Sequence, residues 1–354
     1  MRILVATDAW HPQINGVVRT LTAVEKSAAR MGAQFSFITP ADFSTVPLPG
    51  YPEIPMALPN PRTIARLVTD AKADAIHITT EAPVGYFTRR YCLASNLPFT
   101  TSFHTRLPDY VSARLPIPDR WTWSWMRRFH NAGKGVMAAT PALAAELVGR
   151  GFNNTMLWPR GVDTDLFRPR ADADLGLKRP IFLSVGRLAI EKNLDAFLSL
   201  DLPGTKVVVG DGPARADLQA RFPEAVFLGA QEGETLARTF SAADVFVFPS
   251  RTDTFGLVLL EALASGLPVA AFPVTGPLDV IGNSPVGVLA DDLRTAALLA
   301  LHAPRESCRD FALKHNWDES ARRFLANIHD AVVAPSPELQ PDVTSAKEHS
   351  NVAA

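Results

Sequence analysis

The 354-residue sequence has only two cysteines, Cys92 and Cys308, and they lie in distant segments. Two cysteines so far apart cannot build a disulfide framework, and they lack the close spacing of a cysteine metal site. We therefore expect two free thiols in a protein of a reducing compartment.

Long apolar runs are missing as well. No stretch reaches the roughly 18 uncharged apolar residues that a membrane-spanning helix needs. The beginning, MRILVATDAWHP, contains too short an apolar run for a signal peptide. The sequence therefore predicts a cytoplasmic protein.

An excess of charge of one sign is also absent, because 35 basic and 36 acidic residues leave a formal net charge of −1. This balance gives no electrostatic basis for binding nucleic acid. Apolar residues make up 47% and charged residues 20% of the chain, as in folded globular proteins. A chain of this length is expected to fold as two domains.

Short apolar runs alternate regularly with helical segments. In the first half, strands are expected at Ile3–Thr7, Phe35–Thr39, Ala75–Thr79 and Pro98–Phe103. The second half repeats the pattern in the segments PIFLSVGRL, KVVVGDGP, AVFLG, DVFVFPS, PVAAF and VGVLA. This alternation predicts an α/β fold of two Rossmann-like, doubly wound domains. We expect them to face each other across a cleft, where the carboxyl ends of the strands bind ligands.

The segment WPRGVDTDLFRPRADADLGLKRP separates the two series and has the composition of a linker. We place the N-terminal domain at residues 1–168 and the C-terminal domain at 169–316. A helix over about 317–333 is expected to pack back on the N-terminal domain. The polar residues 335–354 are expected to form a disordered tail.

Gly16 directly precedes a predicted helix in the segment QINGVVRTL. Free N–H groups at a helix start, together with close approach to a glycine, favour an anion such as phosphate. A purely structural turn explains a single glycine equally well. The three spaced glycines of a dinucleotide-binding loop are missing after the first strand, which argues against nicotinamide or flavin cofactors.

Arg187 and Lys192 lie between a strand and a helix in SVGRLAIEKNLDAF. Both could contact one diphosphate, arginine through paired hydrogen bonds and lysine as a point charge. Two solvated surface charges explain the same pattern, and from this loop alone that interpretation is favoured.

Glu261 is the one charged residue in the apolar helical segment LVLLEALA, which follows the loop RTDTFG. A carboxylate among leucines needs hydrogen-bond donors if it is buried. Helix geometry places it one turn from Leu257, beside the amides of Phe255, Gly256 and Leu257. The hydroxyls of a ribose would supply such donors, and an internal salt bridge is the structural alternative.

Together these segments resemble the retaining glycosyltransferases of family 4, which have the GT-B fold. The family's E-x7-E motif stands here within DTFGLVLLEALASGLPV, with Asp253 in place of the usual first glutamate. The other matching segments are TDAWHPQINGVVRTL, SFHT, GVDTDLF, VGRLAIEKNLDAF, VGDGPARADL and FSAADVFVFPS. The resemblance covers about residues 1–330 and is strongest to bacterial α-mannosyltransferases and sulfoquinovosyltransferases.

The resemblance implies how the donor is bound. Glu261 would bind the ribose hydroxyls of a nucleotide sugar. Asp253 and the amides of Phe255–Leu257 would hold the donor sugar. Asp253 is one methylene shorter than glutamate, which leaves this sugar contact in question.

The resemblance also assigns the charged groups near the reaction. Arg187 and Lys192 would neutralise the diphosphate, and Gly16 would approach its other side. His104 would lie beside the donor sugar near the acceptor, with a histidine hydrogen-bonded at a strand end as the structural alternative.

The implied reaction moves a hexose from a nucleotide sugar, with GDP-mannose ahead of UDP-sugars, to a lipid or sugar acceptor with retention of configuration. Fixed cations would stabilise the charge of the leaving diphosphate. No metal and no cofactor are expected. The DTD at Asp163–Asp165 looks like a metal motif of the other glycosyltransferase fold, but it lies in the linker.

Two other functions remain as alternatives. The shortened Asp253 is compatible with a noncatalytic nucleotide-sugar-binding protein, although the presence of His104, Arg187, Lys192 and Glu261 argues against it. A nicotinamide-dependent dehydrogenase is a more distant alternative.

The acceptor side is expected in RLPDYVSARLPIPDRWTWSWMRRFH, which follows His104. Trp121 and Trp125 lie four residues apart and can share a helix face near Arg127 and Arg128. Tryptophan favours the membrane–water boundary, and arginine attracts anionic head groups. The pattern predicts peripheral contact with the inner face of the cytoplasmic membrane and a lipid acceptor. Packing of this segment on its own domain, with a soluble sugar acceptor, is the alternative.

Overall fold

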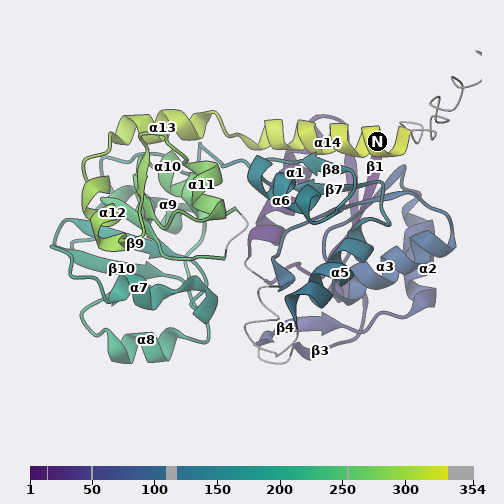
Figure 1. Ribbon diagram of the computed structural model, residues 1–354, viewed down its shortest axis with the longest axis horizontal. Helices are drawn as coiled ribbons and strands as arrows, with labels where there is room; N and C mark the ends of the chain where they lie inside the picture. The colour runs from purple at the N-terminus through teal and green to yellow at the C-terminus, as the bar shows by residue number, and fades with distance from the viewer. Residues whose placement is uncertain (14, 49–50, 109–117, 253–254, 334–354) are drawn as a thin grey trace, which may run out of the picture.

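The computed structural model describes residues 1–13, 15–48, 51–108, 118–252 and 255–333. The chain forms two α/β domains that lie side by side (Figure 1). Asp253 and the tail predicted at 335–354 lie outside the described residues.

A parallel sheet of six strands, in the order β2-β1-β5-β6-β7-β8, forms the N-terminal domain. Its strands are β1 (Arg2–Ala6), β2 (Gln34–Ile38), β5 (Ala75–Ile78), β6 (Phe99–Ser102), β7 (Gly135–Ala138) and β8 (Thr155–Leu157). The helices of this domain are α1 (Gly16–Arg30), η1 (Pro40–Asp42), α2 (Pro61–Ala71), α3 (Pro83–Ala94), α5 (Asp119–His130) and α6 (Pro141–Gly149). Strands β3 (Thr45–Leu48) and β4 (Tyr51–Ala57) form a separate antiparallel hairpin.

The C-terminal domain has its own parallel sheet of six strands, in the order β11-β10-β9-β12-β13-β14. Its strands are β9 (Ile181–Val185), β10 (Thr205–Val209), β11 (Val226–Phe227), β12 (Val245–Phe248), β13 (Val269–Ala271) and β14 (Gly287–Leu289). Its helices are η2 (Ile190–Lys192), α7 (Leu194–Leu198), α8 (Arg215–Arg221), α9 (Gly233–Ala242), α10 (Leu257–Ala264), α11 (Thr275–Val280), α12 (Leu293–Ala300) and α13 (Arg305–Leu313).

Both sheets reverse their strand order beside the first strand, between β1 and β5 and between β9 and β12. Loops at the carboxyl ends of such neighbouring strands diverge and leave room for a ligand. Gly16 at the start of α1, Arg187 in a loop and Glu261 on α10 come after β1, β9 and β12. The predicted pair of doubly wound domains is confirmed, and the topology puts the candidate residues at these reversal points.

Most central strands are buried because helices cover both faces of each sheet. Strand β6 differs, since Thr100, Thr101 and Ser102 are buried polar residues. His77 lies 2.8 Å from the Thr100 hydroxyl through Nδ1 and 3.1 Å from the Ser102 hydroxyl through Nε2. His130 lies 2.8 Å from the Thr101 hydroxyl through Nδ1. Two histidines thus pair the polar groups of this strand inside the domain.

The last described helix, α14 (Trp317–Val333), lies along the N-terminal domain (Figure 1). It packs on α1, and its Ala321, Phe324 and Ile328 enter the N-terminal core. The Val162 N–H donates to the His315 carbonyl at 2.9 Å, so the two connections between the domains run side by side.

The first of these connections is better packed than its composition indicates. Trp158 is fully buried, and Val162 and Phe167 are also buried. Trp158 joins the core of the N-terminal domain, while the other two join that of the C-terminal domain. The predicted linker is therefore packed into the cores of both domains and is not an exposed connection.

Candidate active site between the domains

Glu261 lies on α10 and is 4% exposed. The helix begins at Leu257 after Gly256, whose φ of +79° is unfavourable for other residues. A Cβ at Gly256 would also lie 3.1 Å from Cζ of Phe248. Phe255 packs on the apolar core beneath this turn. The glycine thus sets the direction of α10, and α10 carries the carboxylate.

The two oxygens of Glu261 have different surroundings. Oε1 accepts a hydrogen bond from Nη2 of Arg19, which belongs to α1 in the other domain. Oε2 is buried and has no hydrogen-bond partner among the described residues. A buried carboxylate oxygen is costly without a donor. Glu261 is therefore half of an interdomain ion pair and still has an oxygen that can accept from a ligand.

Sequence reasoning missed Arg19. Burial lowers the pKa of this guanidinium, and the nearby Glu232 carboxylate acts in the opposite direction. The residue stands in QINGVVRTL, three positions after the glycine that was singled out. Its position on the first turn of a helix that faces the cleft was the available signal.

Gly16 begins α1, and the side chain of Asn15 caps this helix by accepting from the N–H groups of Val17 and Val18. A Cβ built on Gly16 would lie 3.9 Å from Cδ1 of Leu257. The structure therefore brings the starts of α1 and α10 together across the domain boundary. Both helix starts carry partial positive charge, which favours an anion between them.

Arg187 follows β9, and Lys192 lies on η2 in the same loop; both are half-buried. The Asn193 amide donates to the Pro249 carbonyl at 3.0 Å, and the Ser250 hydroxyl donates to the Glu191 carbonyl at 3.4 Å. These bonds fix the loop of the two cations to the loop that leads into α10.

The glycines of VVVGDGP pack closely against the backbone of the same loop. A Cβ at Gly210 would lie 1.9 Å from the Gly186 carbonyl oxygen, and one at Gly212 would lie 2.4 Å from that of Leu188. Both glycines have φ values in the region that side chains rarely adopt. Their role is to let the loop after β10 approach the Arg187 loop closely.

His104 follows β6, the polar strand, and is only partly exposed. Its Nδ1 lies 3.4 Å from Nη2 of Arg160, and its ring meets that of Trp158 edge to face at 5.7 Å. Burial lowers the pKa of His104 well below the ordinary value of 6.5, and the charge of Arg160 lowers it further. The imidazole is therefore neutral at physiological pH.

The aspartates of the DTD segment have a structural role. Oδ1 of Asp163 accepts from the N–H groups of Asp165 and Leu166 at 3.1 and 3.0 Å. Both aspartates are exposed. Across the described ranges no cluster of three or more histidine, cysteine or acidic residues could hold a metal ion.

Helix α5 carries the residues predicted for the acceptor side. Trp121 is 64% and Trp125 38% exposed, and Arg127 and Arg128 are exposed as well. Trp123 is buried with Met126 and Phe129. The helix thus has an apolar inner face and an outer face of tryptophan and arginine. No helix in the described part of the chain is long and apolar enough to span a membrane.

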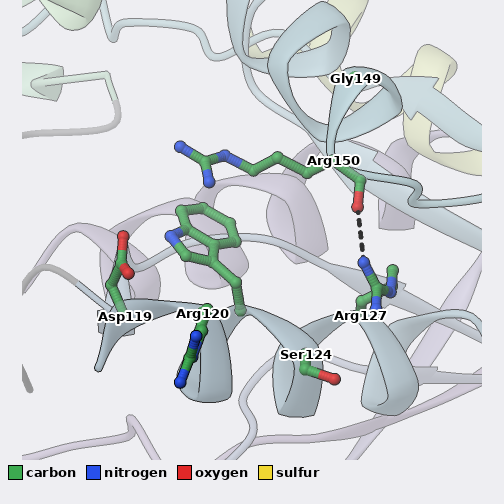
Figure 2. A pocket seen from close by; sticks show the side chains of 7 residues that line it. Asp119, Arg120, Ser124, Arg127, Gly149 and Arg150 are labelled. Atoms are coloured by element: carbon green, nitrogen blue, oxygen red, sulfur yellow. Dashed lines mark hydrogen bonds between the residues drawn. The ribbon is translucent and has the colours of Figure 1, made fainter. Parts of the chain in front are cut away.

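A pocket of about 360 Å³ lies between α5 and the end of α6 (Figure 2). It is lined by Asp119, Arg120, Trp123, Ser124, Arg127, Gly149 and Arg150. The guanidinium of Arg150 stacks 3.8 Å from the centre of the Trp123 ring, and Arg127 donates to the Arg150 carbonyl at 3.2 Å. With three arginines and one aspartate, the pocket adds positive charge beside the outer face of α5.

Two family models cover nearly the whole described chain. Residues 14–166 match Glycosyltransferase Family 4, and residues 168–324 match Glycosyl transferases group 1. The first match contains Gly16, Arg19 and His104, and the second contains Arg187 and Glu261.

Curated relatives agree with these models. A GDP-mannose-dependent alpha-mannosyltransferase of Mycobacterium tuberculosis is 31% identical over 82% of this chain and 83% of its own length. A sulfoquinovosyl transferase of Arabidopsis thaliana is 31% identical over 68% of this chain and 51% of its own. An alpha-monoglucosyldiacylglycerol synthase of Streptococcus pneumoniae is 27% identical over 93% and 85%. The resemblance inferred from the motifs is thereby confirmed.

Among solved structures, a sucrose-phosphate synthase from Thermosynechococcus elongatus superposes with a TM-score of 0.74. It is 20% identical, and the match covers 92% of this chain and 97% of that one. At this identity the likeness concerns the fold, which is the GT-B arrangement of two facing α/β domains.

Proposed function

The chain belongs to glycosyltransferase family 4, and from this premise we propose that it transfers a hexose with retention of configuration and without a metal ion. The donor is a nucleotide sugar, with GDP-mannose ahead of UDP-sugars. The acceptor is a lipid or a sugar.

Glu261 carries this proposal. A ribose offers two neighbouring hydroxyls, and the buried Oε2 is an acceptor with no donor among the described residues. Arg19 on Oε1 balances the carboxylate charge, so a neutral diol can bind without leaving the carboxylate uncompensated. The diphosphate then extends toward the facing starts of α1 and α10.

The charge of the leaving diphosphate explains why two cations, Arg187 and Lys192, belong to the site. As the anomeric carbon bonds to the acceptor oxygen, its bond to the diphosphate breaks, and a departing phosphate oxygen takes the acceptor proton. Arg187 and Lys192 stabilise the negative charge that appears on the diphosphate. Two fixed cations supply the positive charge that a metal ion provides in other transferases, which supports the metal-independent reading.

The donor and acceptor preferences have separate support. The relative from Mycobacterium tuberculosis is named for GDP-mannose, which favours that donor. The relative from Streptococcus pneumoniae is named for a glycosylated diacylglycerol, and α5 presents tryptophans and arginines outward. A lipid acceptor reached from the inner face of the cytoplasmic membrane fits both observations.

A panel of nucleotide sugars tests the proposal. We expect slow hydrolysis of GDP-mannose by the wild-type protein in EDTA. At donor concentrations below the wild-type KM, Glu261→Gln should lose most of this activity. Glu306→Gln, an exposed change on α13, is the matched control and should behave as wild type. Binding without turnover of any donor would favour the noncatalytic alternative. Stabilisation by nicotinamide cofactors alone would refute the nucleotide-sugar site.

A further inference from the structure

Arg160 is a buried cation that the proposed reaction does not use. It is 5% exposed and lies at the start of the connection between the domains. Its Nη1 donates to the Trp158 carbonyl at 2.6 Å, and its guanidinium lies 4.2 Å from the centre of the Trp158 ring. No carboxylate pairs with Arg160 in the part of the chain that the structure describes. Burial lowers the pKa of Arg160 to about 9, so the group stays charged at neutral pH.

Arg160 also makes a polar contact with His104. Nη2 of Arg160 lies 3.4 Å from Nδ1 of His104. A guanidinium can only donate hydrogen bonds, so Nδ1 must be the acceptor and cannot carry a proton. A neutral imidazole has one proton, which must then be on Nε2.

We propose that Arg160 is a positioning residue that holds His104 as a neutral imidazole with its proton on Nε2. In this state His104 donates a hydrogen bond to an oxygen of the substrate and does not act as a base. The consequence for catalysis rests on the proposed function. His104 does not accept the proton of the acceptor hydroxyl, and the departing diphosphate takes it instead. The tautomer itself does not depend on that function.

The groups that surround His104 favour the same state. His77 and His130 are both paired with hydroxyls of β6, and they also act to lower the pKa of His104. Within the described part of the chain, the carboxylate that contacts these histidines is Glu81, whose Oε1 lies 3.0 Å from Nε2 of His130. The pKa of His104 lies well below its ordinary value of 6.5, so the ring is neutral at higher pH. Its protonation should therefore not limit activity between pH 5.5 and 8.

Nitrogen NMR of histidine-labelled protein reads the tautomer directly, without substrate. The spectrum of His104→Gln assigns the His104 signals among the eight histidines. We expect Nδ1 to show the shift of an unprotonated nitrogen and Nε2 that of a protonated one, both constant from pH 5.5 to 8. A proton on Nδ1, or titration of His104 in this range, would overturn the proposal.

Arg160→Met tests whether the arginine is the cause. It removes the donor and the charge at similar volume, so the His104 pKa should move up toward 6.5 and both tautomers should become populated. kcat should then decline on the acid side, whereas in wild type it should not. Arg160→Lys should restore the wild-type tautomer, and Arg66→Met, at an exposed arginine of α2, is the control. An Arg160→Met spectrum identical to wild type would show that Arg160 does not set the tautomer, and wild-type NMR decides the tautomer even if this variant folds poorly.

Discussion

At the scale of single residues, the site depends on groups whose charge is balanced from the opposite domain. Glu261 is buried on α10, and Arg19 reaches one of its oxygens from α1. His104 is held differently, because its neutral ring accepts from Arg160 within the N-terminal domain. In both pairs an arginine donates to one atom of its partner.

Glu261→Gln is expected to weaken donor binding. An amide has one acceptor oxygen where the carboxylate has two, and it loses the charge that attracts Arg19. The donor KM should rise by at least about tenfold, because hydrogen bonds to a charged group contribute roughly 1.5–3 kcal/mol. Steady-state kinetics with varied donor measure this. An unchanged donor KM would assign Glu261 to the interdomain ion pair alone.

Arg187→Ala and Lys192→Ala are expected to act on the chemical step. The charge they balance appears mainly as the diphosphate departs, so kcat should fall by about 10²-fold or more in each variant. Both variants should keep the wild-type melting temperature. Arg238→Ala, at an exposed arginine of α9, is the matched control. Turnover near wild type in either variant would remove it from the diphosphate site.

At the scale of elements, α5 divides its residues between two environments. Trp123, Met126 and Phe129 pack inward, so part of the tryptophan-rich segment does stabilise its own domain. Trp121 and Trp125 stay exposed at the outer face, although the Trp125 ring lies 5.8 Å from that of Phe129. The stretch that links β6 to α5 includes 109–117, which lie outside the described residues.

The outer face of α5 predicts binding to anionic membranes. Each arginine near an anionic surface contributes about 1 kcal/mol, so Arg127→Glu/Arg128→Glu should abolish most sedimentation with anionic liposomes at low salt. Wild-type binding should weaken as salt is added. Arg62→Glu/Arg66→Glu on α2 makes the same charge change elsewhere and should retain binding. If wild type stays in the supernatant with anionic vesicles, the acceptor is a soluble sugar.

Strands that read as short apolar runs between helical segments could be predicted from the sequence. Each strand expected in the first half overlaps an observed strand of the N-terminal sheet, and β1 and β5 are the apolar runs typical of buried parallel strands. The β3–β4 hairpin was missed, since Pro47 and Pro55 interrupt any strand pattern there. Arg19 and Arg160 were missed for another reason. Their partners lie 242 and 56 residues away, and no local pattern encodes such a contact.

At the scale of the whole molecule, the chain crosses between the domains twice at one place. The segment after Trp158 leaves the N-terminal domain, and the segment before α14 returns to it. A Cβ at Gly161 would lie 2.5 Å from the backbone nitrogen of Trp317, so the two crossings are in close contact. The Arg19–Glu261 pair then joins the domains on the cleft side. If ligand binding closes the two domains on each other, the domains would have to rotate about these two crossings, because the crossings are their covalent connections.

The stability of the N-terminal domain should depend on α14 although the helix comes last in the chain. Phe324 is fully buried and contacts the rings of Trp158 and His77, at 4.8 and 5.0 Å between centroids. Replacing a buried phenylalanine by alanine costs about 3–5 kcal/mol. Phe324→Ala should therefore speed hydrogen exchange of the amides of β5 and β6 and leave β9 and β12 at their wild-type rates. Phe197→Ala, a fully buried change in the C-terminal core, should do the reverse. Equal acceleration in both sheets by Phe324→Ala would mean that the two domains unfold as one unit, and no acceleration in β5 and β6 would mean that α14 does not stabilise the N-terminal domain.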